Sequence, residues 1–211
     1  MVMQRLGAIM LCALSIGVAA YAIVAYTALP FGRLVHPEMR AVFEAHAVGI
    51  GLHIFASALA LVLGPFQFSR RLRAARPRLH RWLGRAYLGV GVLAGGLAGL
   101  YMAAFAFGGI VSKLGFGMLA LAWLATGATA YAAIRRRDVT AHRRWMVRNF
   151  ALTFAAVTLR LYLPSSMAAG IPFEIAYPAI AWLCWLPNVA VAEWLVRRPG
   201  ATTNLRASGA V

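Results

Sequence analysis

The chain has 211 residues, of which 62% are hydrophobic and 12% are charged, and its formal net charge is +16. Soluble globular chains carry about 25% charged residues, so this chain has too little polar surface to cover a water-facing globule. The composition therefore excludes an ordinary soluble domain and predicts a protein that lies in lipid.

Six apolar runs are long enough to cross a bilayer as helices, because about 20 residues span a hydrocarbon layer of about 30 Å. In chain order they are residues Leu6–Leu29, Val42–Phe66, Arg85–Phe107, Leu114–Ile134, Met146–Leu163 and Ile175–Val196. We expect an all-α, multi-pass membrane helix bundle with six transmembrane helices. It forms a single transmembrane domain over residues 1–211, with residues 197–211 as a short cytoplasmic tail.

The first run begins near the start of the chain and invites comparison with a leader peptide. Arg5, the apolar stretch after it and the Ala-Tyr-Ala triplet at 20–22 resemble a cleavable signal peptide. The run continues past this triplet to Leu29. We therefore favour an uncleaved first helix.

The second run carries two histidines, His46 and His53, which lie seven residues apart and share one face of a helix. His53 falls near the membrane midplane, where an ionisable side chain is costly unless it faces a cavity or a partner. The functional interpretation is a ligand-binding imidazole. The structural alternative is a neutral ring bonded to a backbone carbonyl across a helix contact.

Three glycines in the third run, Gly91, Gly95 and Gly99, recur at intervals of four residues. They lie on one helix face, where bare backbone lets a neighbouring helix approach closely and gain contacts that lipid does not supply. We expect this helix at the centre of the bundle.

Two short gaps, before the third and fifth runs, hold 13 of the 21 basic residues. The first gap has Arg70, Arg71, Arg73, Arg76, Arg78, Arg81 and Arg85 around His80, and the second has Arg135, Arg136, Arg137, Arg143, Arg144 and Arg148 around His142. If six helices thread the bilayer, 17 basic residues fall on the side of these gaps and three on the other. The positive-inside rule then places both termini in the cytoplasm, with the protein in a bacterial inner membrane.

The two gaps also resemble each other, because residues 80–85 align with residues 142–148 with one inserted residue. This pattern is typical of a duplicated hairpin. Pro77 suits a first helical position and Thr140 suits an N-cap, so each histidine falls in a first helical turn, where an anion is favoured. We expect a cytoplasmic anion or anionic lipid headgroups to bind His80, Arg81, Arg85, His142, Arg143 and Arg148.

The fifth run contains Arg160, which keeps its proton in proteins and so needs a carboxylate, carbonyl groups or water. Its candidate partners are Glu44 and Glu174, and a structural ion pair is one interpretation. The other is a cationic lining for a pocket that opens to the outside. The candidate ligand-binding residues of that pocket are His46, His53, Asn149, Thr153 and Arg160.

The sixth run contains Pro178, Pro187 and Asn188, so we expect its backbone to be kinked. Glu193 near its end is expected to pair with an arginine of the basic gaps.

Several segments together resemble a known family: residues 64–68, 80–87 and 142–148, Leu152-Thr153, and Arg160. They are similar to the predicted bacterial membrane proteins catalogued as domain of unknown function 2306, over about Val42 to Glu193. The resemblance implies a helical membrane protein. It implies no established activity, so no catalytic residue is carried over.

Three classes of function stay open. The first is binding or transport of a small or lipid-like ligand through a polar intramembrane pocket. The second is a b-type haem cytochrome in electron transfer, with His80 and His142 as axial ligands at the start of helices that run in the same direction. Against it, di-haem cytochromes b carry four ligands well within their helices. The third is an enzyme, and we find no paired carboxylates, metal-spaced cluster or nucleophile motif for one without a cofactor.

The expected partner is the lipid bilayer, with anionic headgroups at its cytoplasmic face. Nucleic acid is not expected, because the basic residues lie between apolar runs and the aromatic residues lie within them. No metal site is expected apart from the haem alternative. A homo-oligomer or another membrane partner stays open.

Overall fold

The computed structural model of the protein describes residues 2–198, with side chains from Leu6 onward, and confirms the predicted all-α fold. It is 85% helical, and no strand occurs among the described residues. Residues 199–211, which include Arg206, lie outside the described part. Within residues 2–198, six helical spans are long and apolar enough to cross a membrane: Leu6–Ala28, Ala47–Gln67, Pro77–Ala103, Gly109–Arg135, Val139–Ala168 and Phe173–Arg197.

Several of these spans are built from more than one helical element. The first three comprise α1 (Val2–Ala28), α3 (Ala47–Gln67) and the series α5 (Pro77–Ala86), the π-helical η2 (Tyr87–Ala94) and α6 (Gly95–Ala103). The last three comprise α7 (Gly109–Arg135), the pair α8 (Val139–Thr153) and α9 (Ala155–Ala168), and the pair α10 (Phe173–Leu183) and α11 (Leu186–Arg197). Short connecting helices are η1 (Pro37–Met39), α2 (Arg40–Ala45) and α4 (Arg70–Ala75).

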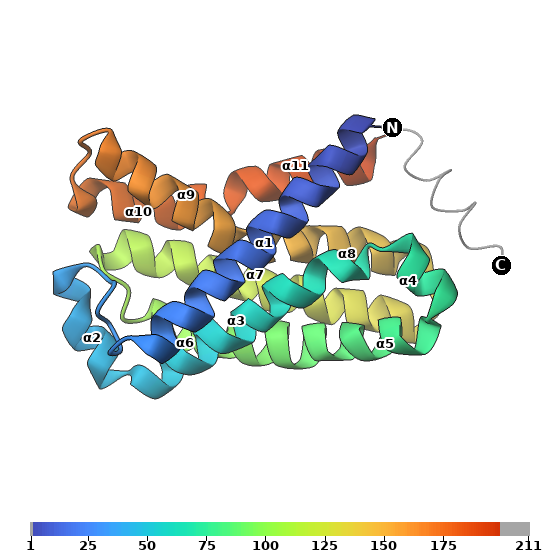
Figure 1. Cartoon of the computed structure of the whole chain (residues 1–211), viewed down its shortest axis with the longest axis horizontal. Helices are drawn as coiled ribbons and strands as arrows, with labels where there is room; N and C mark the ends of the chain where they lie inside the picture. Colours follow the sequence, from blue (N-terminus) through green and yellow to red (C-terminus); the bar gives the residue numbers. More distant parts are fainter. Residues whose placement is uncertain (1, 199–211) are drawn as a thin grey trace.

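The spans run back and forth along the long axis of the molecule (Figure 1). The start of α1, the turn around α4, the α7–α8 turn and the end of α11 lie together at one end, on the right of the view. We name this the basic end, because both arginine-rich gaps lie there. The α2 connection and the α6–α7 and α9–α10 turns lie at the opposite end.

The third and fifth spans begin earlier than their apolar runs, because part of each basic gap is itself helical. Pro77 opens α5, as predicted. The N-cap of α8 is Asp138 and not Thr140, since an Asp138 carboxylate oxygen accepts a hydrogen bond from the Ala141 N–H at 2.8 Å. A carboxylate also complements the positive end of the helix dipole, which favours it at this position.

The third span packs on α3 through its glycine face. A Cβ built at Gly91 would lie 2.8 Å from the Cβ of Ala60, and one at Gly95 would lie 3.2 Å from the Cβ of Ala56. The missing side chains therefore let the two helices approach closely. These two spans have the largest buried share of the six, 39% each, so the third span lies deep in the bundle as expected.

The sixth span is broken as predicted. α10 ends at Leu183, and α11 begins at Leu186 with Pro187 in its first turn. The Asn188 amide donates to the carbonyl oxygen of Cys184 at 3.0 Å, which satisfies a backbone group at the break. The fifth span continues beyond its predicted end, to Ala168.

Candidate functional site

Two cavities lined by residues within 6–198 concern the candidate residues, and we name them the central cavity and the basic cavity. The central cavity has a volume of about 420 Å³ and is lined by residues of α1, α2, α3, α6, α7, α8, α9 and α10 and by the connection around η1. The basic cavity has a volume of about 1080 Å³ and lies at the basic end, among α3, α4, α5, η2, α7, α8 and α11. The candidate residues divide between them.

The central cavity brings together three of the five residues expected to bind a ligand. His53, Thr153 and Arg160 line it. His46 does not, because its ring stacks on Phe105 at 3.8 Å between centroids and its Nδ1 lies 2.8 Å from the hydroxyl of Tyr101. The fifth residue, Asn149, is buried outside the lining.

His53 is held in one orientation by a backbone contact. Its Nδ1 lies 2.8 Å from the carbonyl oxygen of Gly95, which can only accept, so the Nδ1–H is the donor. The Nε2 atom is then an acceptor on a ring that also lines the cavity. The contact matches the structural alternative, and the position of the ring leaves a binding role open as a proposal.

Arg160 lies in the central cavity without an acidic partner. Its Nη1 donates to the carbonyl oxygen of Ala156 at 3.0 Å. Across residues 6–198 the ion pairs involve Glu193 only, so neither Glu44 nor Glu174 pairs with Arg160. A guanidinium in a largely apolar wall is therefore available to a ligand.

The sequence analysis missed His36, which also lines the central cavity. Its ring stacks on Phe173 at 4.0 Å between centroids, nearly parallel. The Nδ1 atom of His36 and the hydroxyl of Ser57 are buried without a hydrogen-bond partner, and both residues line the cavity. His36 lies in the short connection before η1, where no helical spacing marks a residue as inward-facing.

A hydrogen-bonded polar layer lies between residues that line the two cavities. It is formed by Tyr87, Trp123, Asn149 and Thr153. The Tyr87 hydroxyl donates to Asn149 Oδ1 at 2.7 Å and lies 2.8 Å from Thr153 Oγ1. Trp123 Nε1 donates to Thr153 Oγ1 at 2.9 Å, and Asn149 Nδ2 donates to the Trp123 carbonyl oxygen at 2.8 Å. Trp123 and Thr153 face the central cavity, and Gly127 beside Asn149 faces the basic one.

The basic cavity gathers cations from both arginine-rich gaps. None of the five acidic residues of the chain lines it. Five of the six residues expected to bind an anion line this cavity: His80, Arg81, Arg85, His142 and Arg143. Four further arginines, which the sequence analysis did not select, complete the lining: Arg70, Arg73, Arg135 and Arg144.

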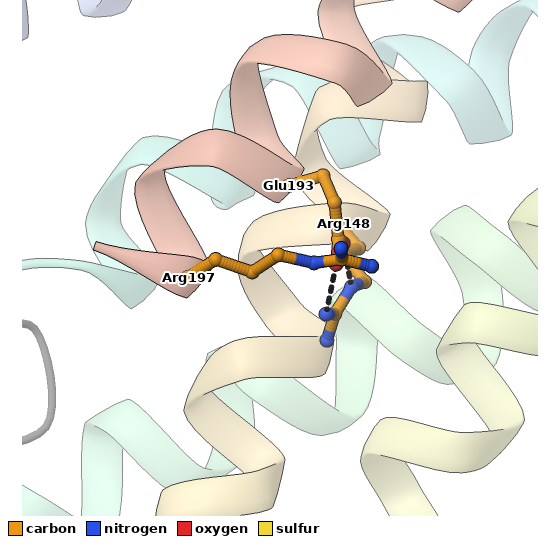
Figure 2. Close-up of polar contacts among 3 residues, drawn as sticks. All are labelled: Arg148, Glu193 and Arg197. Carbon is orange, nitrogen blue, oxygen red and sulfur yellow. Dashed lines mark hydrogen bonds and ion pairs between the residues drawn. The ribbon is translucent and has the colours of Figure 1, made fainter. Parts of the chain in front are cut away.

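The sixth expected residue, Arg148, is occupied elsewhere (Figure 2). Its Nε and Nη2 atoms donate to the two carboxylate oxygens of Glu193 at 2.8 and 3.1 Å. Arg197, one turn later on α11, also pairs with Glu193. The predicted pairing of Glu193 with an arginine of the basic gaps is confirmed, and it ties α8 to α11.

Both histidines of the duplicated turns line the basic cavity, and they come from different helices. α5, which carries His80, packs on α3 and α4, whereas α8, which carries His142, packs on α7 and α11. The Nδ1–H of His142 donates to the carbonyl oxygen of Ala130 at 2.9 Å, which leaves Nε2 as the acceptor nitrogen. The Nδ1 atom of His80 is buried without a partner.

Comparison with known proteins places the chain in a family. Neither the curated proteins nor the solved structures gave a match. A family model matches residues 50–196, which include both histidine turns, Arg160 and the glycine face of the third span. Because the match covers more than half of the chain, the protein belongs to the family described as Predicted membrane protein (DUF2306).

Proposed function

We propose that the protein binds a small or lipid-like amphiphile with an anionic group, and that the central cavity is the site. The observation that carries this proposal is Arg160, a permanent cation whose only hydrogen bond among residues 6–198 is to the carbonyl of Ala156. An anionic ligand would supply the acceptors that the chain does not.

The rest of the central cavity favours an apolar body on the same ligand. Its wall includes Tyr26, Ile54, Phe116, Trp123 and Tyr177, which present aromatic and aliphatic surface. Binding cavities for small molecules are commonly of this kind, apolar with a few polar groups that fix orientation. Arg160 and His53 take that orienting role in the proposal.

The charge distribution supports an orientation for this site. With the basic end in the cytoplasm of a bacterial cell, the central cavity opens toward the other side of the inner membrane. A ligand would then enter from the outer leaflet or the periplasm. The bonded polar layer closes the path onward, so transport would require that layer to open.

The proposal is tested with oleate and oleyl alcohol, which share an apolar chain and differ in the anionic group. Oleate should raise the unfolding temperature of the detergent-purified protein more than oleyl alcohol does. Arg160→Gln should abolish the difference and Arg160→Lys should keep part of it. Arg33→Gln, at an exposed position in the connection after α1, is the matched control. A difference that persists in Arg160→Gln would reject the site.

The basic cavity supports a second candidate function, electron transfer by a b-type haem. The observation that favours it is that His80 and His142 line one cavity, with the His142 ring fixed through Nδ1 so that Nε2 is the ligand atom. Protein purified from a haem-sufficient host should show a reduced-minus-oxidised b-type spectrum. His80→Ala and His142→Ala should lose it, whereas His46→Ala should retain it; colourless wild-type protein rejects this candidate.

A further inference from the structure

Unpartnered hydrogen-bonding atoms concentrate in the basic cavity. Across residues 6–198, six buried side-chain nitrogen or oxygen atoms lack a hydrogen-bond partner. Three of them belong to residues that line this cavity: Gln67 Nε2, His80 Nδ1 and Arg144 Nε. A buried donor without an acceptor is costly, so donors gathered in one cavity indicate a ligand that brings acceptor atoms.

The charge of the cavity points to the same kind of ligand. Seven arginines and two histidines line it, and no carboxylate of the chain does. Burial and the nearby guanidinium groups of Arg143 and Arg70 lower the pKa of Arg73. Arg73 is fixed at the wall, because its Nη1 donates to the carbonyl oxygen of Gln67 at 2.9 Å. Cations crowded in this way are stabilised by an anion among them.

The wall changes from polar to apolar along the cavity. Gln67 lies at the change, with only 7% of its surface exposed, and its side-chain oxygen packs against Gly84, where an added Cβ would lie 3.1 Å away. Beyond it, the lining includes Leu88 and Val92 of η2 and Leu124 of α7. A ligand that fills the space therefore needs an acidic head and an apolar body.

We propose that the basic cavity binds an amphiphile through a carboxylate or phosphate group held by Gln67 and Arg144, with its apolar body between η2 and α7. Where the ligand is a lipid, His80 adds a further hydrogen-bonding group. Two sources have this chemistry: an anionic phospholipid of the adjacent leaflet, and a haem with its propionates. If the ligand is haem, this inference rests on the second candidate function. If the ligand is a lipid, the inference is independent of that function. In both cases the inference is independent of the central cavity.

The test uses full-length protein, delipidated in detergent, and two probes. In one arm dioleoyl-phosphatidylglycerol is titrated against dioleoyl-phosphatidylcholine, and in the other haemin is added, with thermal unfolding and visible absorbance as readouts. The variants are Gln67→Leu and Arg144→Gln. The control is Arg136→Gln, which removes the same charge from an exposed position of the same gap outside the lining.

We expect phosphatidylglycerol or haemin to bind. Gln67→Leu and Arg144→Gln should each lower the affinity for that probe by about tenfold, whereas Arg136→Gln should change the affinity by less than about twofold. Equal losses in Arg144→Gln and Arg136→Gln would overturn the inference, because they would indicate general attraction to the charged surface. Binding of neither probe would overturn it too. Binding of phosphatidylglycerol alone would reject the haem candidate and support the site.

Discussion

At the scale of single residues, the chain satisfies its buried polar groups by bonding them to each other. Tyr87 and Asn149 are fully buried and share one hydrogen bond, and Thr153 contacts both Tyr87 and Trp123. In hydrocarbon an unsatisfied hydroxyl or amide costs free energy, so the layer works as a unit. Asn149, selected from the sequence as a ligand-binding residue, is committed to this layer.

Tyr87→Phe tests the layer, because it removes the hydroxyl and keeps the ring. Asn149 Oδ1 loses its donor, so we expect the free energy of unfolding to fall by about 1–2 kcal/mol. The measurement is unfolding in detergent micelles. Tyr131→Phe is the control: its hydroxyl is exposed and bonds only to Arg135. Equal stability of Tyr87→Phe and wild type would contradict the assignment.

At the scale of elements, α3 and the third span pack closely against each other. Small residues meet along this contact, with Gly91 facing Ala60 and Gly95 facing Ala56. Near this contact the backbone widens into the π-helix η2, a form that is rare and often found at functional sites. Its residues Leu88 and Val92 line the basic cavity, so helix packing and cavity shape are linked.

Gly95→Leu should break this contact. Its Cβ would lie 3.2 Å from the Cβ of Ala56 and 3.3 Å from the Ser57 hydroxyl, so α3 would have to shift to admit a side chain there. We expect a loss of about 1–3 kcal/mol from overpacking and a lower yield of folded protein by size-exclusion chromatography. Gly17→Leu, where nothing lies within 4 Å of an added Cβ, should be tolerated. Normal yield and melting of Gly95→Leu would refute the packing role.

How far the sequence predicts the fold and the site depends on the range of each cause. The bilayer thickness sets the length of an apolar run, and a glycine at every fourth residue marks one helix face. The membrane spans and the glycine face therefore depend on residues close together in the sequence and could be predicted from it. The bond that holds Arg148 to Glu193 joins α8 to α11, and only the three-dimensional structure showed that Arg148 leaves the basic cavity. His36 gave no signal because loop residues lack periodicity.

At the scale of the whole molecule, positive charge collects at one end of a bundle that has few charges elsewhere. The arginine-rich turns around α4 and between α7 and α8 lie together, and the end of α11 adds Arg197 (Figure 1). Arginine near an anionic leaflet is attracted to it by about 1 kcal/mol per residue, and this bias sets orientation during insertion.

The proposed orientation is tested by labelling single cysteines in a background where Cys12 and Cys184 are replaced by alanine. A cysteine at Lys113 should react with a membrane-impermeant maleimide in intact cells. One at Arg136, at the opposite end of α7, should react only after the membrane is permeabilised. Both positions are exposed, so access decides the outcome. The reverse pattern would invert the topology and move both proposed sites to the other leaflet.

The layer formed by Tyr87, Trp123, Asn149 and Thr153 has a consequence for the cell. The layer lies between residues of the central cavity and residues of the basic cavity. Its donors and acceptors are bonded to one another. A continuous file of water would conduct protons and dissipate the membrane potential. We expect the bonded side chains to hinder such a file, because their donors and acceptors are already engaged with one another.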